Sequence, residues 1–190
     1  VVTYVYDALG RRNAKLLALG LESGIIWYFY DNEDILTEFE ILPDDGSAVP
    51  RSIYTHGVGI DDPLMMERDA NANQTFEAGE RFFYHTDGLG SVTDLTNNTG
   101  LIVQSYVYDS FGNIVLQSGT IANPYTYTGR EFDPESGLFY YRHRYYDSKT
   151  GQFISEDPIG FASGDFYGNF QHMFCPAVGG CNPAGSCAVG

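Results

Sequence analysis

Oxygen-bearing side chains recur at regular places between Asp69 and Glu80, where the sequence is DANANQTFEAGE. A calcium loop of this length takes ligands from its places 1, 3, 5, 7, 9 and 12, the seventh through a backbone carbonyl and the twelfth through a bidentate glutamate. In this sequence the carboxylates at places 1, 9 and 12 would give the site a formal charge of −3, which suits Ca²⁺. Counted from the first aspartate, the predicted ligands are Asp69, Asn71, Asn73, Thr75, Glu77 and Glu80.

One position of this loop departs from the calcium pattern. Gln74 occupies the sixth place, where glycine normally allows a positive φ. The flanks also differ from a pair of helices, because the following RFFYH is typical of a strand and Pro63 lies in the short segment before the loop. Two interpretations stay open, a calcium-binding loop and a solvated insertion between two strands.

A second group of candidate residues lies in GLFYYRHRYYDSKTGQFISEDPIG, at 137–160. One interpretation is structural: the arginines pair with acids on neighbouring strands and the tyrosines pack. The alternative is catalytic, because two carboxylates that share a site can hold one proton between them and so supply acid and base together. Alternation along the strand would place on opposite faces Tyr141, His143 and Tyr145, and Arg142, Arg144 and Tyr146.

Composition limits the classes of partner. The chain has 190 residues with a net charge of −15 and a pI near 4.3, which argues against binding a nucleic-acid backbone. The sequence contains neither a signal-peptide pattern nor an apolar run long enough to span a bilayer, so we expect no membrane span in this fragment. Because it opens at Val1 on a strand-like run, we expect a fragment or processed product.

The cysteines give little support for a metal or redox site. Cys175, Cys181 and Cys187 all lie in the last 16 residues, and an odd number cannot pair completely. Their spacing also misses the CxxC pattern of zinc sites. Together with the glycines and prolines around them, they favour an irregular tail.

The elements that must position these residues are predicted to be short strands. Runs of four to nine β-forming residues recur along the chain and end at Gly, Asp, Asn or Pro. The leucine-rich segment AKLLALGLE at 14–22 is the one stretch with helical character. Gly20 interrupts it and it lacks an N-cap, so we expect strand or irregular structure there.

A short unit repeats along the chain: an aromatic or polar residue, then Asp, then two to four residues, then Gly. The aspartate is expected to cap its own turn, the glycine to take a positive φ, and the preceding tyrosine to end a strand. A series of such hairpins predicts one long antiparallel sheet. The unit begins at Tyr6, Thr86, Tyr108, Phe132 and Tyr146, and at Tyr30 without its glycine.

These motifs resemble the YD-repeat proteins, through YDALGRR, HTDGLGSVTDLTNNTGLIVQSYVYDSFGNIV and YTGREFDPESGLFYYRHRYYDSKTGQFISEDPIG. The last of them resembles the Rhs repeat-associated core, and the resemblance covers residues 1 to about 165. It implies an all-β fold, an antiparallel β-hairpin array that forms a segment of a spiralling β-shell and ends in the Rhs core. We expect a YD-repeat segment at 1–131 with the calcium-type loop inserted at 69–80, the core at 132–165 and the tail at 166–190.

The resemblance also implies a function. In bacterial Rhs proteins, toxin-complex C components and teneurins such a sheet builds a hollow shell, and in the bacterial members the shell encloses a variable C-terminal polypeptide, often a toxin. We therefore expect a structural, encapsulating role, with adjoining YD repeats and the protein's own C-terminal polypeptide as partners. A secreted or cell-surface location follows from the same resemblance.

Two other functions stay open. Several family members cleave themselves in the core through an aspartate, and Asp157 is the matching residue here. The second Asp-Pro-x-Gly element of the family does not follow Asp165, so the sequence favours a chain without turnover of its own. A carbohydrate-binding module is the other alternative, because exposed tyrosine rings flanked by Asp and Asn suit sugar rings.

Overall fold

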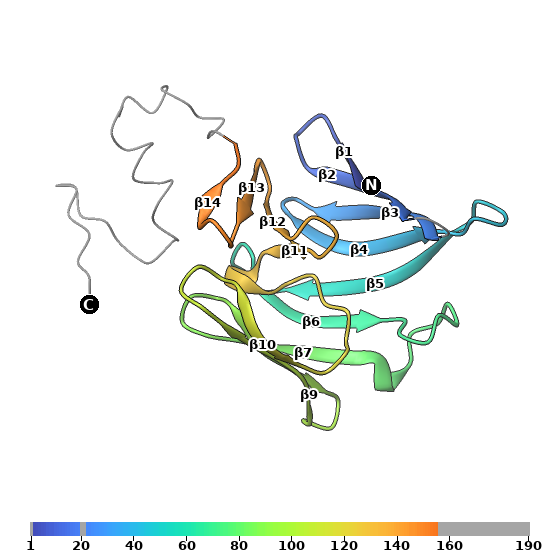
Figure 1. Ribbon diagram of the computed structural model, residues 1–190. Helices are drawn as coiled ribbons and strands as arrows, with labels where there is room; N and C mark the ends of the chain where they lie inside the picture. The colour runs from blue at the N-terminus through green and yellow to red at the C-terminus, as the bar shows by residue number, and fades with distance from the viewer. Residues whose placement is uncertain (1, 20–21, 156–190) are drawn as a thin grey trace.

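The computed structural model describes residues 2–19 and 22–155, and within them strands form two antiparallel sheets (Figure 1). The first sheet has ten strands that pair in chain order, each with the next. They are β1 (Val2–Tyr6), β2 (Arg12–Leu19), β3 (Glu22–Asp31), β4 (Asp34–Ile41), β5 (Ala48–His56), β6 (Pro63–Arg68), β7 (Arg81–Thr86), β8 (Val92–Asn97), β9 (Ile102–Tyr108) and β10 (Ile114–Ser118).

The second sheet has four short strands, again in chain order. The all-β hairpin array is confirmed, as is strand structure at 14–19. The expected boundary between 131 and 132 falls inside β11. The remaining elements are β11 (Glu131–Asp133), β12 (Leu138–Tyr141), β13 (Arg144–Asp147) and β14 (Gln152–Phe153), with 3-10 turns η1 (Ala78–Glu80) and η2 (Tyr127–Gly129).

The repeated Asp-to-Gly unit forms turns in the way predicted. Asp109 Oδ1 accepts hydrogen bonds from the backbone N–H of Phe111 at 2.8 Å and of Asn113 at 3.0 Å, and Gly112 takes a φ of +88°. Glycine carries no Cβ to oppose that left-handed conformation. The same contacts and a positive glycine φ recur in the turns 7–11 and 87–91.

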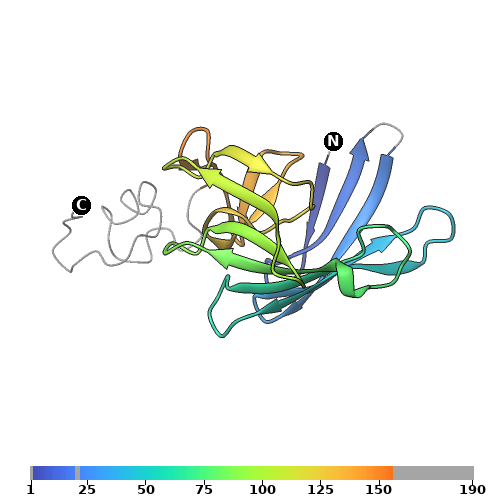
Figure 2. The same ribbon diagram turned by 90° about the horizontal axis from the view of Figure 1, so that it is seen from below.

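A β-bulge lies close to the turn in each of the hairpins β1–β2, β3–β4, β5–β6, β7–β8 and β9–β10. A bulge bends its strand and increases the local twist. These bulges all lie toward the same end of the sheet, and the sheet curves into a trough (Figure 2).

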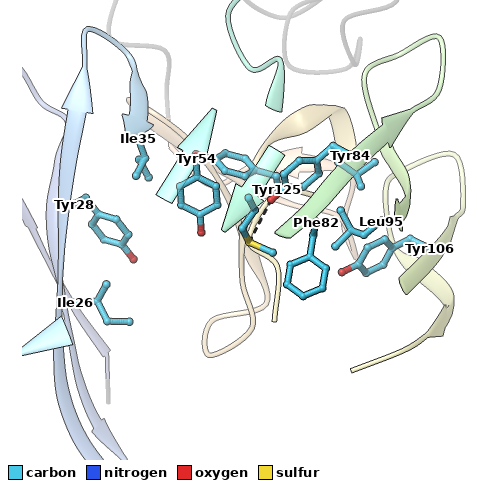
Figure 3. Close-up of a cluster of buried hydrophobic side chains, with 11 residues drawn as sticks. Ile26, Tyr28, Ile35, Tyr54, Phe82, Tyr84, Leu95, Tyr106 and Tyr125 are labelled. Atoms are coloured by element: carbon cyan, nitrogen blue, oxygen red, sulfur yellow. Dashed lines mark hydrogen bonds between the residues drawn. The ribbon is translucent and has the colours of Figure 1, made fainter. Parts of the chain in front are cut away.

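The concave face of the trough is the buried one. In β3 the side chains of Ile26 and Tyr28 are buried, whereas Trp27 and Phe29 between them are 48% and 54% exposed, as period-two alternation requires. The segment 119–130 crosses the concave face and places Tyr125 against the sheet (Figure 3). The buried cluster comprises Ile26, Tyr28, Ile35, Tyr54, Met66, Phe82, Tyr84, Val92, Leu95, Tyr106 and Tyr125.

The interpretation of LFYYRHRYY as one continuous strand is wrong. The segment is a hairpin in which β12 and β13 meet at a turn formed by Arg142 and His143, and Tyr141 pairs directly with Arg144. The predicted division of side chains between two faces therefore fails beyond Tyr141. Arg142 reverses the chain with a φ of 58°, a conformation that its sequence neighbours do not signal.

Candidate functional site

The turns that follow β1, β3, β5, β7 and β9 lie together at one end of the ten-stranded sheet, and the second sheet packs against them (Figure 1). We call this row of turns the docked end. It comprises residues 7–11, 32–33, 57–62, 87–91 and 109–113.

The turn 109–113 supports the last hairpins of the chain. Tyr146 donates a hydrogen bond from its hydroxyl to the Phe111 carbonyl at 2.9 Å, and Asn113 donates from Nδ2 to the Ser148 carbonyl at 2.9 Å. In the neighbouring turn 87–91, Ser91 Oγ accepts a hydrogen bond from the backbone N–H of Thr128 at 3.1 Å. Hydrogen bonds thus join two adjacent turns to the region of the second sheet.

Asp61, in the turn 57–62, joins three segments that are distant in sequence. Its carboxylate accepts from Arg130 Nη2 and from Arg142 Nη2, each at 2.8 Å. Arg142 also lies 3.2 Å from the carboxylate of Glu33 in the turn 32–33. Burial raises the pKa of Asp61, and the two guanidiniums oppose that rise. The prediction that the core arginines pair with acids holds for Arg142, but its partners are turn residues of the first sheet.

Arg12, the first residue of β2, directly follows the turn 7–11 of the docked end and is buried, with 1% of its surface exposed. Its Nη1 donates to Asp133 Oδ2 and its Nη2 to Glu131 Oε2, each at 2.5 Å. The guanidinium also lies over the ring of Tyr140, 4.4 Å from the centroid. A buried ion pair of this kind must be well bonded to offset the loss of hydration. Arg12 therefore connects β2 to both β11 and β12.

Lys15 extends this contact into a cluster of five charges. Its Nζ lies 3.3 Å from Asp133 Oδ1 and 2.8 Å from Glu135 Oε2. Three carboxylates thus face the two cations Arg12 and Lys15. Burial raises the pKa of Glu131 to about 7, although the ion pair with Arg12 lowers it. A proton on one of the three acids would balance the charge of the cluster.

The tyrosine of the repeat has a role that the sequence did not reveal. Tyr30 donates its hydroxyl to the Arg12 carbonyl, and Tyr108 donates to the Val92 carbonyl, each at 2.7 Å. His56 stands in the equivalent place before the turn 57–62, and its Nε2 lies 3.0 Å from the Ile35 carbonyl. Each ring therefore connects its hairpin to the start of an even-numbered strand in the preceding hairpin. The ring and the carbonyl it contacts are 18, 16 and 21 residues apart in the sequence, and this recurring separation is the signal that could have predicted the contact.

The loop 69–80 lies at the opposite end of the sheet. Asp69 accepts from the backbone N–H of Asn73 at 3.0 Å and of Gln74 at 2.7 Å. Gln74 adopts a φ of 65°, the left-handed conformation that glycine gives to calcium loops. Asn71 Oδ1 also accepts from the Asn73 N–H, and Asn73 Oδ1 from the Thr75 N–H. The first half of the loop is thus wound around its own polar side chains.

The second half of the loop is held by Glu80, which is 7% exposed. Its two carboxylate oxygens accept from the backbone N–H of Ala70 at 2.9 Å and of Glu77 at 3.0 Å. Glu77 in turn accepts from Asn73 Nδ2 at 3.0 Å. Across the described residues the side chains of His, Cys, Asp and Glu do not form a group of three or more arranged to hold a metal ion. The loop therefore closes through its own hydrogen bonds, and Ca²⁺ binding stays a prediction.

Several predicted residues lie outside the described ranges. They are Asp157, Asp165 and the cysteines Cys175, Cys181 and Cys187. Self-cleavage through Asp157 therefore stays a prediction, which a gel can test, since Asp157→Asn should abolish processing of the intact protein if that residue carries it.

Most tyrosine rings are unavailable for stacking on a sugar. Among the fourteen tyrosines of the described residues eight are buried, and they pack against one another and against the backbone. This burial argues against the carbohydrate-binding alternative, which requires exposed rings. The buried tyrosines are Tyr28, Tyr54, Tyr84, Tyr106, Tyr125, Tyr127, Tyr140 and Tyr146.

The geometry defines a class of protein: a hairpin-repeat sheet, curved into a trough, whose turns at one end carry a small second sheet. The sequence matches the teneurin YD-shell family over residues 1–163. The chain belongs to that family. The expectation of a YD-repeat protein is confirmed.

Relatives and solved structures agree with this assignment. The tRNA3(Ser)-specific nuclease WapA of Bacillus spizizenii is 31% identical over 166 residues, which cover 86% of this chain and 6% of that protein. The toxin protein Tse5 of Pseudomonas aeruginosa is 30% identical over 178 residues, which cover 85% of this chain and 14% of that protein. The crystal structure of TcdB2-TccC3 has the same fold, with a TM-score of 0.66 at 19% identity over 84% of this chain and 8% of that one.

The chain thus spans a small part, 6% and 14%, of these two curated relatives. Within residues 2–19 and 22–155, helices of the length and apolar character needed to cross a membrane are absent.

Proposed function

We propose that this chain is the closing segment of a YD-repeat shell, and that the shell encloses a variable C-terminal polypeptide, as a polymorphic toxin does. The trough supplies part of the curved wall. The second sheet closes one end of that wall. Adjoining YD repeats would complete the sheet at its free edges, because unpaired strand edges otherwise promote association.

The observation that supports this proposal is the docked end. Four of its turns contact the second sheet or the residues leading to it, through hydrogen bonds or through the ion pairs of Asp61 and Glu33. Next to the fifth turn, 7–11, Arg12 makes the buried ion pairs with β11. Buried ion pairs at one end are not needed to continue a hairpin array. They are expected where a second sheet must stay fixed on the end of the wall and close it.

Electron cryo-microscopy of the intact protein tests the proposal. We expect a hollow particle closed at one end by residues 131–153, with additional density inside. Deletion of the polypeptide that follows residue 163 should remove the internal density and leave the wall unchanged. A solid particle, or a wall whose interior does not change on deletion, would contradict it.

The same proposal implies export. The relative Tse5 is a toxin protein, and a toxin acts outside the compartment in which it is made. Immunoblots of medium and cell fractions against residues 2–155 would place the intact protein; confinement to the cytoplasmic fraction throughout growth would contradict export.

We also propose that the loop 69–80 binds Ca²⁺, which would rigidify the β6–β7 connection. The conformation of Gln74 supports this, because a non-glycine residue held at positive φ costs about 1–2 kcal/mol and a bound ion would offset that cost. Asp69, Asn71 and Asn73 would provide side-chain oxygens, and Glu80 would share its carboxylate between the ion and two backbone N–H groups.

Calorimetry on the purified chain decides this second proposal. Millimolar Ca²⁺ should release or absorb heat, and Glu80→Gln should abolish the signal. Asp44→Asn, in the turn 42–47, serves as the control for loss of one exposed carboxylate. A flat titration of the wild type, or an unchanged signal in Glu80→Gln, would rule the site out.

A further inference from the structure

A cavity of about 300 Å³ lies between the concave face of the sheet and the segment 121–135. Four of the ten Lys and Arg residues of this acidic chain line it. Four acids line it as well, so the formal charge of its wall is zero while that of the chain is −15, and a proton on Glu131 would make the wall positive. An anionic group would meet less repulsion here than over most of the surface. The four cations are Arg12, Lys15, Arg51 and Arg68.

Arg51 reaches this cavity because of a bulge in β5. Ser52 pairs with Glu38 and Pro50 pairs with Phe39, so Arg51 between them is the extra residue. Bulges redirect a side chain in this way. In a regular strand Arg51 would face opposite to Ser52, whose cross-strand neighbour in β6 is Arg68. The bulge thus adds a second guanidinium to the cavity wall beside Arg68.

These two arginines are less fully bonded than Arg12. Arg68 Nη1 lies 3.0 Å from Ser52 Oγ and 3.7 Å from Glu38 Oε2. Arg51 Nη1 lies 3.4 Å from Glu40 Oε2. A guanidinium has five N–H donors, and these contacts use Nη1 alone. Both side chains therefore retain donors for a ligand carboxylate, whereas both Nη atoms of Arg12 are already bonded to acids.

Apolar side chains complete the wall around the charges. Ile26 and Tyr28 lie on the sheet side, Tyr106 on β9, and Ile121 and Phe132 on the covering segment. A ligand that fits this lining combines a carboxylate with apolar groups on either side of it.

We propose that the cavity binds an extended peptide segment in which acidic side chains alternate with apolar ones, the carboxylates bonded by Arg51 and Arg68. The occupant would be a segment of the polypeptide that the shell encloses, so the inference rests on the proposed function. The inner wall would then prefer segments with alternating acidic and apolar side chains, and it would hold one such segment of the enclosed polypeptide in place.

Fluorescence anisotropy with the purified 190-residue chain tests the inference. The probe is a fluorescein-labelled, end-capped pentapeptide with two glutamates separated by phenylalanine and flanked by leucine and serine. A matched peptide carries glutamine in place of both glutamates. The glutamate peptide should bind at least about tenfold more tightly, since a charge-assisted hydrogen bond contributes about 1.5–3 kcal/mol. Added salt should weaken it.

Substitutions assign the binding to the cavity. Arg51→Gln and Arg68→Gln should each weaken binding of the glutamate peptide about tenfold, whereas Arg81→Gln, which removes a cation paired with Glu67 outside the cavity, should leave it unchanged. If Arg68→Gln does not fold, Arg51→Gln decides alone, because the Arg51 side chain is 31% exposed and weakly paired.

Equal binding of the two peptides, or wild-type binding by Arg51→Gln, would overturn the inference. Either result leaves the proposed shell intact, because the internal density expected by electron cryo-microscopy does not depend on a preferred peptide chemistry. Absence of that density in the intact protein would instead contradict both the proposed shell and the proposed peptide site.

Discussion

Arg12 is the residue on which the contact between the two sheets most depends. It is buried, and its ion pairs with Glu131 and Asp133 cross from the first sheet to the second. Replacing it leaves two buried carboxylates without their main counter-ion. Such a loss typically costs about 3–5 kcal/mol.

We therefore predict that Arg12→Gln lowers the free energy of unfolding by about 3–5 kcal/mol in urea titrations. The neighbouring Arg11→Gln is the matched control, because Arg11 pairs with Asp7 near the surface and should cost at most about 1 kcal/mol. Equal losses in the two variants would show that the buried cluster does not stabilise the fold.

Glu131 should make the stability depend on pH. Its pKa is raised from 4.5 to about 7 by burial, so the folded state holds a proton that the unfolded state has lost. The stabilisation from this proton is complete below about pH 4.5 and disappears as the pH rises through about 7. We predict that the free energy of unfolding of the wild type falls, relative to Glu131→Gln, across this range.

Urea titrations of both proteins at several pH values between 4 and 8 measure this difference. A difference that stays constant over the range, or that grows in favour of the wild type as the pH rises, would mean that Glu131 is ionised in the folded protein throughout.

Residue chemistry was predictable where it is local. The capping of turns by Asp109 and the positive φ of Gly112 follow from the repeat alone, because both interactions lie within five residues. The Arg12 cluster was not predictable, because its partners lie 119 and 121 residues away and the sequence does not encode that pairing in any short pattern.

At the scale of elements, the hairpin turns act both as chain reversals and as contact surfaces. Gly112 and Gly100 illustrate the difference, since both have a positive φ, at 88° and 82°. A Cβ on Gly112 would lie 2.4 Å from the ring of Tyr127, whereas a Cβ on Gly100 would have open space around it. The turn that contains Gly112 thus packs closely against η2, whereas the turn that contains Gly100 has no neighbour within 4 Å of that position.

We predict that Gly100→Ala costs about 1–2 kcal/mol from backbone strain alone, and that Gly112→Ala costs a further ~1–3 kcal/mol from the clash with Tyr127. Thermal unfolding followed by circular dichroism compares the two. Equal midpoints would mean that the contact between the turn 109–113 and η2 contributes nothing to stability.

The hairpin β12–β13 shows where element prediction fails. Turns were expected at Gly, Asn, Asp or Pro, and Arg142–His143 contains none of them. Arg142 is held at positive φ by its ion pairs with Asp61 and Glu33, which lie on turns of the other sheet. Tertiary contacts therefore determine this turn, and the alternating pattern across it was misleading.

At the scale of the whole molecule, the fold is a curved wall with one closed end. The bulges near each docked turn account for the curvature, and Asp61 and Arg12 connect the wall to the small sheet. The hairpin order and the fold class were predictable, because the repeat and its spacing define them. The closure was implied only by resemblance to a family, since it depends on contacts between segments far apart in sequence.

Protease protection in the intact protein tests the closure most directly. A cleavage site for a specific protease, inserted into the polypeptide that follows residue 163, should stay uncut in the native wild type. In the double variant Arg12→Gln/Asp61→Asn, which weakens the docked end, the same site should be cut, while Arg11→Gln/Asp44→Asn should retain protection. Cleavage of the native wild type at the rate of the denatured protein would contradict enclosure by a closed shell.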